Sequence, residues 1–258
     1  MKKHINPLEK LMIQNFTTCC KIRHPVLLEQ LIINWPALDS WDIEYLQSKY
    51  GDIIIPIEYF TNEYFRPSKI INIKFSEYLT TLKTATKRPS IYLSELELTK
   101  YFPELLSDIR TPAFLPPTVK LHHKLFFGYA SIASAHYHAV RQALLCQIIG
   151  NKKVYLIHPR YFYRLSPEPW YSTSFNFSKI NFSNEQQLEK YKKYFIEVNL
   201  KPGDALFIPI NWWHLVIGEQ LSLSLTFFWD ATFTWEDFTI PWLRSKFGIL
   251  NTRLRQVF

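Results

Sequence analysis

The sequence predicts a mainly β protein, with a barrel or sandwich of strands and helices at its flanks. Two observations support this fold class. From about residue 120 onwards, short apolar runs alternate with turn signals, which is typical of a barrel or a sandwich. Before that point, helical and strand patterns are mixed. The chain has 258 residues, of which 47% are hydrophobic, so it can bury one large core.

Residues 1–115 are predicted to form a mixed α/β flank. Apolar periodicity predicts amphipathic helices at 41–51 and 75–83, and an apolar run predicts a strand at 52–60. The segment 25–35 is typical of a strand followed by a turn. Because no low-complexity tract separates this flank from the rest, we expect it to be integrated with the barrel.

Residues 116–230 are predicted to form the barrel core. Turn signals such as Gly150-Asn151 and Lys201-Pro202-Gly203-Asp204 separate its strands. The predicted strands are 125–131, 135–138, 143–149, 152–159, 197–200, 205–210, 212–218 and 221–229. One long polar excursion, 161–195, interrupts them, and we expect it to lie over a site because long connections in compact domains are more often functional than accidental.

Residues 231–258 are predicted to form a C-terminal helical segment with apolar residues on one side. Such a face can pack on the barrel or on a second subunit, and the sequence does not separate the two. The apolar positions are Trp242, Leu243, Phe247, Leu250 and Leu254.

Composition limits the setting in which the protein works. The net charge of +8 would suit an acidic partner such as nucleic acid, but Lys and Arg are spread along the chain and form no dense block. The three cysteines, Cys19, Cys20 and Cys146, are an odd number and include an adjacent pair, which favours a reducing compartment. With no apolar stretch long enough for a signal peptide or a membrane span, we expect a soluble, cytoplasmic protein with no membrane partner.

Two histidines stand one residue apart in the stretch AHYHAVRQALLCQIIGNKK, residues 135–153. Side chains at i and i+2 of a strand share a face, so His136 and His138 should project together, with Tyr137 on the opposite side. A third histidine, His214, follows a turn and a strand, where a barrel would bring the chain back beside its earlier strands. Three imidazoles could then hold one metal ion. Each histidine taken alone is more often a hydrogen-bonded core residue, and that alternative stays open.

The order of segments along nearly the whole chain resembles the JmjC and cupin-like 2-oxoglutarate oxygenases, in particular the branch of the asparaginyl hydroxylase that acts on hypoxia-inducible factor. The resemblance rests on HPVLLEQLIINWPALDSWDIEYLQSKYGD and YLSELEL before the barrel, and on AHYHAVRQALLCQIIGNKK and LKPGDALFIPINWWHLV within it. It implies a double-stranded β-helix, a jelly-roll barrel with a metal inside its open end.

In this family iron is held by His-x-Asp on one strand and a distal histidine. Carried over by position, His136 matches the first ligand and His214 the last, while His138 stands where the carboxylate should be. The change removes one negative charge but leaves three nitrogen donors, a set that suits Fe(II), Zn(II), Ni(II) or Cu(II).

The resemblance also implies a site for 2-oxoglutarate, whose distal carboxylate would be bound by Lys152 and Tyr92. Three other polar positions of the family are altered in this chain, and an aromatic side chain at the last of them could fill the pocket. They are Ala133 for a threonine, Gln142 or Ala143 for an asparagine, and Phe227 for a later asparagine.

Three functions are therefore compatible with the sequence. The first is an Fe(II)- and 2-oxoglutarate-dependent hydroxylase of a protein side chain. The second is a metal-binding cupin that needs no 2-oxoglutarate, and the third is a degenerate relative kept as a binding module. The substrate is expected to be a protein, with RNA or a small molecule also open. A homodimer through the C-terminal helical segment is expected by analogy with the hydroxylase branch.

Overall fold

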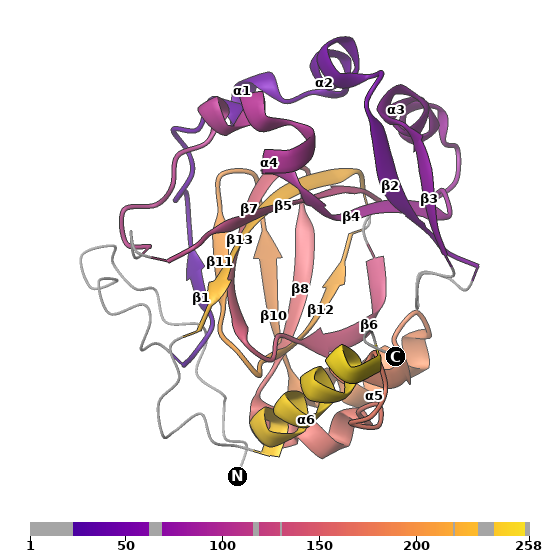
Figure 1. The fold of residues 1–258 in the computed structure, drawn as a ribbon, viewed down its shortest axis with the longest axis vertical. Helices are drawn as coiled ribbons and strands as arrows, with labels where there is room; N and C mark the ends of the chain where they lie inside the picture. The colour runs from indigo at the N-terminus through magenta and orange to yellow at the C-terminus, as the bar shows by residue number, and fades with distance from the viewer. Residues whose placement is uncertain are drawn as a thin grey trace.

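The strands of the protein form two antiparallel sheets that lie face to face (Figure 1). The structure is a computed structural model that describes residues 23–61, 69–115, 119–129, 131–218, 220–231 and 240–255. Cys19 and Cys20 lie outside these residues, and Cys146 is a buried free thiol. None of the described helices is long and apolar enough to cross a membrane.

Within the described residues the larger sheet has eight strands. They are Val26–Leu28 (β1), Ile54–Tyr59 (β2), Lys69–Lys74 (β3), Ile91–Glu97 (β4), His122–Gly128 (β5), Arg141–Ile149 (β7), Ala205–Ile208 (β11) and Ser222–Asp230 (β13). Their spatial order is β1-β11-β7-β13-β5-β4-β2-β3.

The smaller sheet has five described strands. They are Ser131–Tyr137 (β6), Lys152–Ile157 (β8), Phe177–Asn181 (β9), Phe195–Leu200 (β10) and Trp213–Ile217 (β12). Their order is β10-β8-β12-β6-β9, so both sheets contain neighbours that are far apart along the chain, as a jelly roll requires. The predicted fold class, mainly β with flanking helices, is confirmed.

Helices occupy two opposite ends of the molecule (Figure 1). The helices α1 to α4 gather at one end, and α5 and α6 lie at the other. Their bounds are Ala37–Ser40 (α1), Ile43–Tyr50 (α2), Phe75–Thr84 (α3), Leu98–Tyr101 (α4), Glu185–Tyr191 (α5) and Ile240–Arg255 (α6), with 3-10 turns at Pro103–Asp108, Pro159–Leu165 and Lys192–Tyr194.

The two helices expected in the flank are present as α2 and α3. The side chain of Asp42 accepts a hydrogen bond from the Tyr45 backbone N–H at 2.7 Å and so caps the start of α2. In α3, Phe75, Tyr78, Leu79 and Leu82 are buried, the spacing of one helix face. That face packs on the outer side of the larger sheet, in the same core cluster as strand residues of β5.

Successive side chains of β13 face alternately the outer core and the space between the two sheets. Leu223, Leu225 and Phe227 join the core beneath the helices of the flank. Phe228 belongs instead to the core between the two sheets, and Thr226 faces a cavity there. Successive side chains of a strand point to opposite faces, so this single strand seals the outer core and lines the interior of the barrel.

Segments of the flank contribute strands directly to the larger sheet. In β1, Val26 pairs with Phe207 of β11, and in β4, Leu93 pairs with Phe127 of β5. Strand pairing of this kind does not by itself delimit domains, so the division into 1–115, 116–230 and 231–258 stays a prediction.

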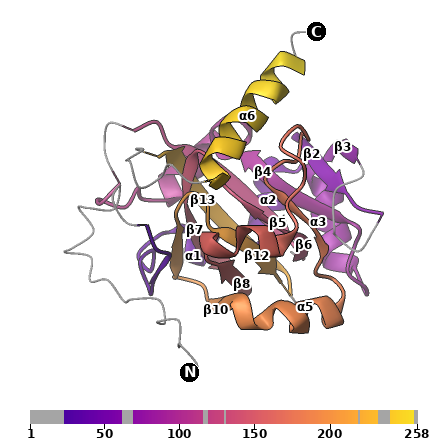
Figure 2. The same cartoon turned by 90° about the horizontal axis from the view of Figure 1, so that it is seen from below.

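The polar excursion of 161–195 is not structureless. It contains β9, which pairs with β6, and α5, which begins after the Asn184 cap; the strand was not predicted from the sequence. Its neighbour α6 confirms the predicted C-terminal helix and, in Figure 2, extends away from the sheets. Arg244 of α6 donates a hydrogen bond of 2.6 Å to the backbone carbonyl of Glu168, so this helix packs on the excursion.

Part of the apolar face of α6 is exposed. Leu243, Phe247 and Leu250 are 48%, 56% and 56% exposed. Trp242 is half-buried, and the side chain of Leu254 lies outside the described part of the chain.

We predict that Tyr78→Phe destabilises the fold without touching the barrel interior. The Tyr78 hydroxyl donates to the Phe127 carbonyl of β5 and accepts from the Leu93 N–H of β4 at 3.0 Å, at a point where the ladder between these strands shifts register. Loss of a buried hydroxyl with two partners should lower the free energy of unfolding by about 1–3 kcal/mol, measured by denaturant unfolding. Tyr101→Phe is the control and should change stability little, because the Tyr101 hydroxyl accepts an exposed hydrogen bond from the neighbouring Lys100 ammonium.

Candidate metal centre and cavity

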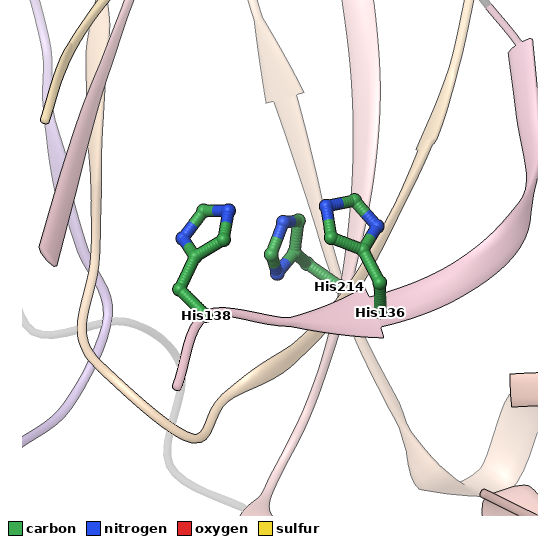
Figure 3. A group of neighbouring side chains, drawn as sticks. All are labelled: His136, His138 and His214. Atoms are coloured by element: carbon green, nitrogen blue, oxygen red, sulfur yellow. The ribbon is translucent and has the colours of Figure 1, made fainter. Parts of the chain in front are cut away.

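Three histidines from two neighbouring strands converge inside the barrel (Figure 3). His136 lies on β6, His138 follows directly after it, and His214 lies on β12. The strands β6 and β12 pair antiparallel with His214 opposite His136, which brings residues distant in sequence side by side. The Asn211 N–H donates to the His138 carbonyl at 2.9 Å, which holds the turn before β12 against the end of β6.

The alternation predicted for this stretch is found. His136 and His138 face the cavity, while Tyr137 between them is fully buried on the opposite side and packs on Trp213, with ring centroids 4.8 Å apart. Figure 3 shows the three imidazoles projecting to the same side of the ribbon, with His214 between the other two.

The spacing of the imidazoles suits one ion. The candidate ligand atoms, one from each ring, all lie within 4.8 Å of one another. The ring centroid of His214 is 4.1 Å from that of His136 and 4.6 Å from that of His138. The backbone carbonyl of Trp212 lies 3.1 Å from His214 Nδ1, and a protonated Nδ1 that donates to it leaves the lone pair on Nε2.

Burial keeps these imidazoles neutral. It lowers the pKa of His136 and of His138 well below the usual histidine value, and the neighbouring His214 lowers both further. Burial also lowers the pKa of His214 to about 4, against a raising effect of its hydrogen bond to the Trp212 backbone. Neutral imidazoles have a lone pair to donate, and His138 Nδ1 is buried with no hydrogen-bond partner among the described residues. The donor set therefore fits a divalent metal ion.

The histidines open into a cavity of about 220 Å³ between the two sheets. Its walls are largely apolar and aromatic, with a few polar and charged groups among them, which is typical of ligand sites. The lining residues that carry the argument below are Glu58, Tyr92, Glu95, Lys152, Thr226 and the three histidines.

Lys152 lies at the start of β8 and reaches into this cavity. It is only 3% exposed, and its Nζ donates to Ser224 Oγ at 2.7 Å. Ser224 in turn donates to Gln147 Oε1 at 2.6 Å, and the Gln147 amide donates to the carbonyls of Ile149 and Gly150. The ammonium is therefore fixed by a chain of neutral groups, and within the described residues no carboxylate lies within 4 Å of it.

Burial of this ammonium is costly. It lowers the pKa of Lys152 from 10.5 to about 7. At 1.36 kcal/mol for each pKa unit, the charged form is disfavoured by on the order of 5 kcal/mol, more than a hydrogen bond to a serine returns. An anionic ligand in the cavity would supply the missing stabilisation.

The other positions named from the resemblance separate into those that face the cavity and those that do not. Tyr92, 2% exposed, lines the same cavity as Lys152. Ala143 also lines it, whereas Gln142 lies on the opposite face of β7, so of the two candidate positions Ala143 faces the cavity. The side chain of Ala133 is not among those the structure describes.

The expectation that Phe227 could fill the pocket is wrong. Phe227 points to the outer core, where its ring lies 5.9 Å from that of Trp35 and 5.1 Å from that of His123. The strand alternation of β13 places Thr226 and Phe228 in the cavity instead. The small side chain of Thr226 therefore lines the cavity, and the neighbouring ring of Phe227 does not enter it.

The polar excursion does reach the cavity, as expected. Asn176 and Phe177 line it, and the Phe177 ring stacks on that of His136 with centroids 5.1 Å apart. The Asn176 side chain donates to the Tyr137 carbonyl at 3.0 Å, and the Tyr137 N–H donates to the Asn176 carbonyl at 3.1 Å. These contacts fix the excursion against the strand that carries two of the histidines.

Two carboxylates in the cavity were missed by the sequence analysis. Glu58 lies on β2 opposite Tyr92 of β4, and Glu95 lies beyond Tyr92 on β4 itself. Burial, together with repulsion by Glu95, raises the pKa of Glu58 to about 7 against a lowering hydrogen bond from Ser94. The only signal in the sequence was an acidic residue inside an apolar strand run, IIIPIEYF, and nothing local marked Glu95.

These features define a class: a cupin-like jelly-roll barrel with a candidate metal centre of three histidines in its cavity. The family is also shown by comparison with known proteins. The chain belongs to the Cupin-like domain family, whose sequence pattern matches residues 14–235.

Several characterised proteins are similar to the chain. It is 29% identical over 243 residues to Jumonji C domain-containing protein 5 of Drosophila melanogaster, covering 88% of this chain and 60% of the relative. It is 28% identical over 218 residues to Lysine-specific demethylase 8 of Xenopus tropicalis, covering 80% of this chain and 48% of the relative. It is 24% identical over 228 residues to tRNA wybutosine-synthesizing protein 5 of Danio rerio, covering 80% of this chain and 69% of the relative.

The chain thus spans 60% and 48% of the length of the first two relatives. Two of these relatives are named a Jumonji C domain-containing protein and a lysine-specific demethylase, and these similarities do not show the asparaginyl hydroxylase branch.

We predict that His136→Ala, His138→Ala and His214→Ala each weaken binding of Fe(II), Zn(II) or Ni(II) at least about tenfold, because each removes one of three donors. Metal content after dialysis against a fixed free metal concentration measures the effect. His122→Ala, on β5 and paired with Glu97 at 3.6 Å, is the control. Wild-type loading of His138→Ala beside an empty His136→Ala would show that His138 is not a ligand.

We predict a pH dependence of stability that originates at Glu58. Because the pKa of Glu58 is raised to about 7 in the folded state, protonation stabilises the fold fully below about pH 4.5, and this contribution is lost as the pH rises through 7. The loss is at most about 3 kcal/mol, reduced by water that reaches the cavity. Thermal unfolding between pH 4.5 and 8 should show a smaller decline for Glu58→Gln than for wild type, whereas the exposed Glu104→Gln should follow wild type.

Proposed function

We propose that the protein is an Fe(II)- and 2-oxoglutarate-dependent oxygenase that hydroxylates a protein side chain. One observation carries the proposal. Three neutral imidazoles and a buried lysine with no described anionic partner open into the same apolar cavity. A cation that costs this much to bury is best explained by an anion that binds there.

His136, His138 and His214 would hold the iron, which supplies oxygen activation when it is bound. Lys152 would pair with the distal carboxylate of 2-oxoglutarate, and Tyr92 would contact the same group. The hydrogen bonds from Lys152 through Ser224 to Gln147 fix the ammonium before the ligand arrives, so little side-chain freedom is lost on binding. The aromatic lining, with Phe126 and Phe177 among it, excludes water.

The third imidazole changes the charge of the centre and not its ability to bind a metal. A neutral His138 leaves the ion's two positive charges uncompensated by the protein ligands, whereas a carboxylate would cancel one of them. We expect Fe(II) alone to bind more weakly than in a centre with a carboxylate, and a dianionic co-substrate to strengthen the complex by restoring the balance. Zn(II) or Ni(II) would occupy the same donors.

Hydroxylation and demethylation are close alternatives for the same centre. Both insert one oxygen atom into a C–H bond, and they differ in whether the carbon is part of the side chain or of an N-methyl group. Several relatives are named lysine-specific demethylases, which supports oxidation of a protein side chain. One is named for tRNA, which keeps RNA as an alternative substrate, and a small molecule stays a further one.

Two other functions compete with this one. The neutral three-histidine set also suits a metal-binding cupin that oxidises its substrate without 2-oxoglutarate. A degenerate binding module is the third candidate, and the orientation of Phe227 away from the cavity removes one argument for it. A cytoplasmic location and a homodimer through the exposed face of α6 are further proposals, the latter supported by Leu243, Phe247 and Leu250.

The test is an anaerobic titration with Fe(II) and then 2-oxoglutarate, followed by the visible charge-transfer absorption that appears when the 2-oxo acid chelates iron. Wild type should give a saturable band. Lys152→Met, which keeps the length of the side chain but not its charge, should weaken 2-oxoglutarate binding at least about tenfold with Fe(II) binding retained, because one charged partner is lost.

Lys153→Met is the matched control, since the adjacent lysine points out of the cavity toward Glu197 and should behave as wild type. Equal bands in all three proteins would contradict the role of Lys152. Bound metal with no band would favour the cupin that works without 2-oxoglutarate, and absence of metal binding would favour the binding module.

A further inference from the structure

We propose that a second cavity, on the outer side of the larger sheet, binds a small carboxylic acid with an apolar body such as a ring. The cavity has a volume of about 220 Å³ and lies between residues 31–35, which follow β1, and residues 110–114, which follow the 3-10 turn Pro103–Asp108. None of the described residues that line it also lines the cavity of the histidines. The inference therefore goes beyond the proposed function and does not depend on it.

The strand β13 lies between the two cavities. Trp35, which lines the second cavity, belongs to the outer core, and its ring centroid is 5.9 Å from that of Phe227. Phe227 faces away from the histidines, whereas Thr226 beside it lines their cavity. A ligand in the second cavity would therefore rest against the back of the sheet that carries part of the first one, and the two sites are separate.

Both walls of the second cavity are held by backbone hydrogen bonds. In one wall the Trp35 N–H donates to the Ile32 carbonyl at 2.9 Å, and the Ile32 N–H donates to the Gly203 carbonyl at 3.0 Å. In the other wall the Leu115 N–H donates to the Pro112 carbonyl at 3.0 Å. Because the walls are formed before a ligand arrives, little backbone freedom is lost on binding.

Three polar side chains line the second cavity and have no partner in the described part of the chain. They belong to Asn34, Arg110 and Thr111, all of them exposed, and no described side chain or backbone group forms a hydrogen bond or an ion pair with any of the three. The guanidinium is always charged, and its planar set of donors matches the two oxygens of a carboxylate. The amide and the hydroxyl can donate to the same anion.

The remaining described lining is apolar. Trp35 and Phe114 are 4% and 9% exposed, and Leu31 is half-buried. Arg110 carries the only charge among the described lining residues, so the cavity offers one positive charge beside a largely apolar wall. A monocarboxylate with a ring or a branched chain matches both features, because its charge pairs with the guanidinium and its body covers the indole and phenyl rings.

The experiment uses three small probes that separate the charge from the apolar body. Benzoate carries both, benzamide keeps the ring without the charge, and acetate keeps the charge without the ring. Each probe is titrated into the full chain and followed by NMR. Because Lys152 in the histidine cavity can also attract a carboxylate, all titrations are repeated on Lys152→Met.

Benzoate should bind wild type at least about tenfold tighter than benzamide or acetate, since each of these lacks one of the two contacts. Arg110→Met should lower benzoate affinity to that of benzamide and leave benzamide binding unchanged. Lys152→Met should keep the preference for benzoate, and so should Arg164→Met, the matched control at an exposed arginine outside the cavity. Thermal unfolding of each variant checks that it is folded.

Three results would overturn the inference. The first is equal binding of benzoate and benzamide by wild type, and the second is acetate binding as tight as that of benzoate. The third is a preference for benzoate that persists in folded Arg110→Met, and its loss in Lys152→Met would then assign the carboxylate to the histidine cavity.

Discussion

The antiparallel pairing of β6 with β12 is the constraint on which the candidate site depends. It places His214 opposite His136, and strand alternation then places His138 on the same side. A slip of β6 by one residue would turn His136 and His138 out of the cavity and bring Tyr137 into it, and a slip of β12 would do the same to His214 and Trp213. The large aromatic residues between the histidines therefore do more than fill a core. Their packing outside the smaller sheet makes the alternative register costly and so fixes the direction of the ligands.

Electrostatic cost is concentrated in the same cavity. Lys152 is buried without a described anion, Glu58 and Glu95 repel each other, and the imidazoles are kept neutral by burial. Elsewhere the ion pairs among the described residues lie at the surface, as for Lys83 with Glu44 and Lys74 with Asp52. Buried titratable groups with shifted pKa values that gather in one cavity are characteristic of ligand-binding sites.

Much of the fold could be predicted from the sequence, because local patterns are strong along the barrel. Local patterns predicted eight of the nine described strands between residues 116 and 230 and the helices α2 and α3, and the i, i+2 spacing correctly predicted that His136 and His138 share a face. The strand β9 was missed because its pairing with β6 is a long-range contact with little local signal in FSKIN.

The residues that the sequence did not assign correctly depend on register. Phe227 and Thr226 are adjacent in sequence, and only the pairing of β13 decides which of them enters the cavity. The same holds for Gln142 and Ala143 on β7. Glu95 depends on a register shift in β4 that no turn residue announces. Side-chain chemistry can be read from the chain, but the side of a sheet on which it falls requires the partner strand.

The strand β13 has a consequence for how this barrel can diversify. Its residues Leu223, Leu225 and Phe227 belong to the outer core, while Thr226 and Phe228 line the cavity and Ser224 bonds the Lys152 ammonium there. Positions that stabilise the fold thus alternate along one strand with positions that face the cavity. Substitutions at the inward positions can alter which molecule is accepted while the outward positions keep the protein folded, so a lineage of such barrels can acquire new substrates without passing through unstable ancestors.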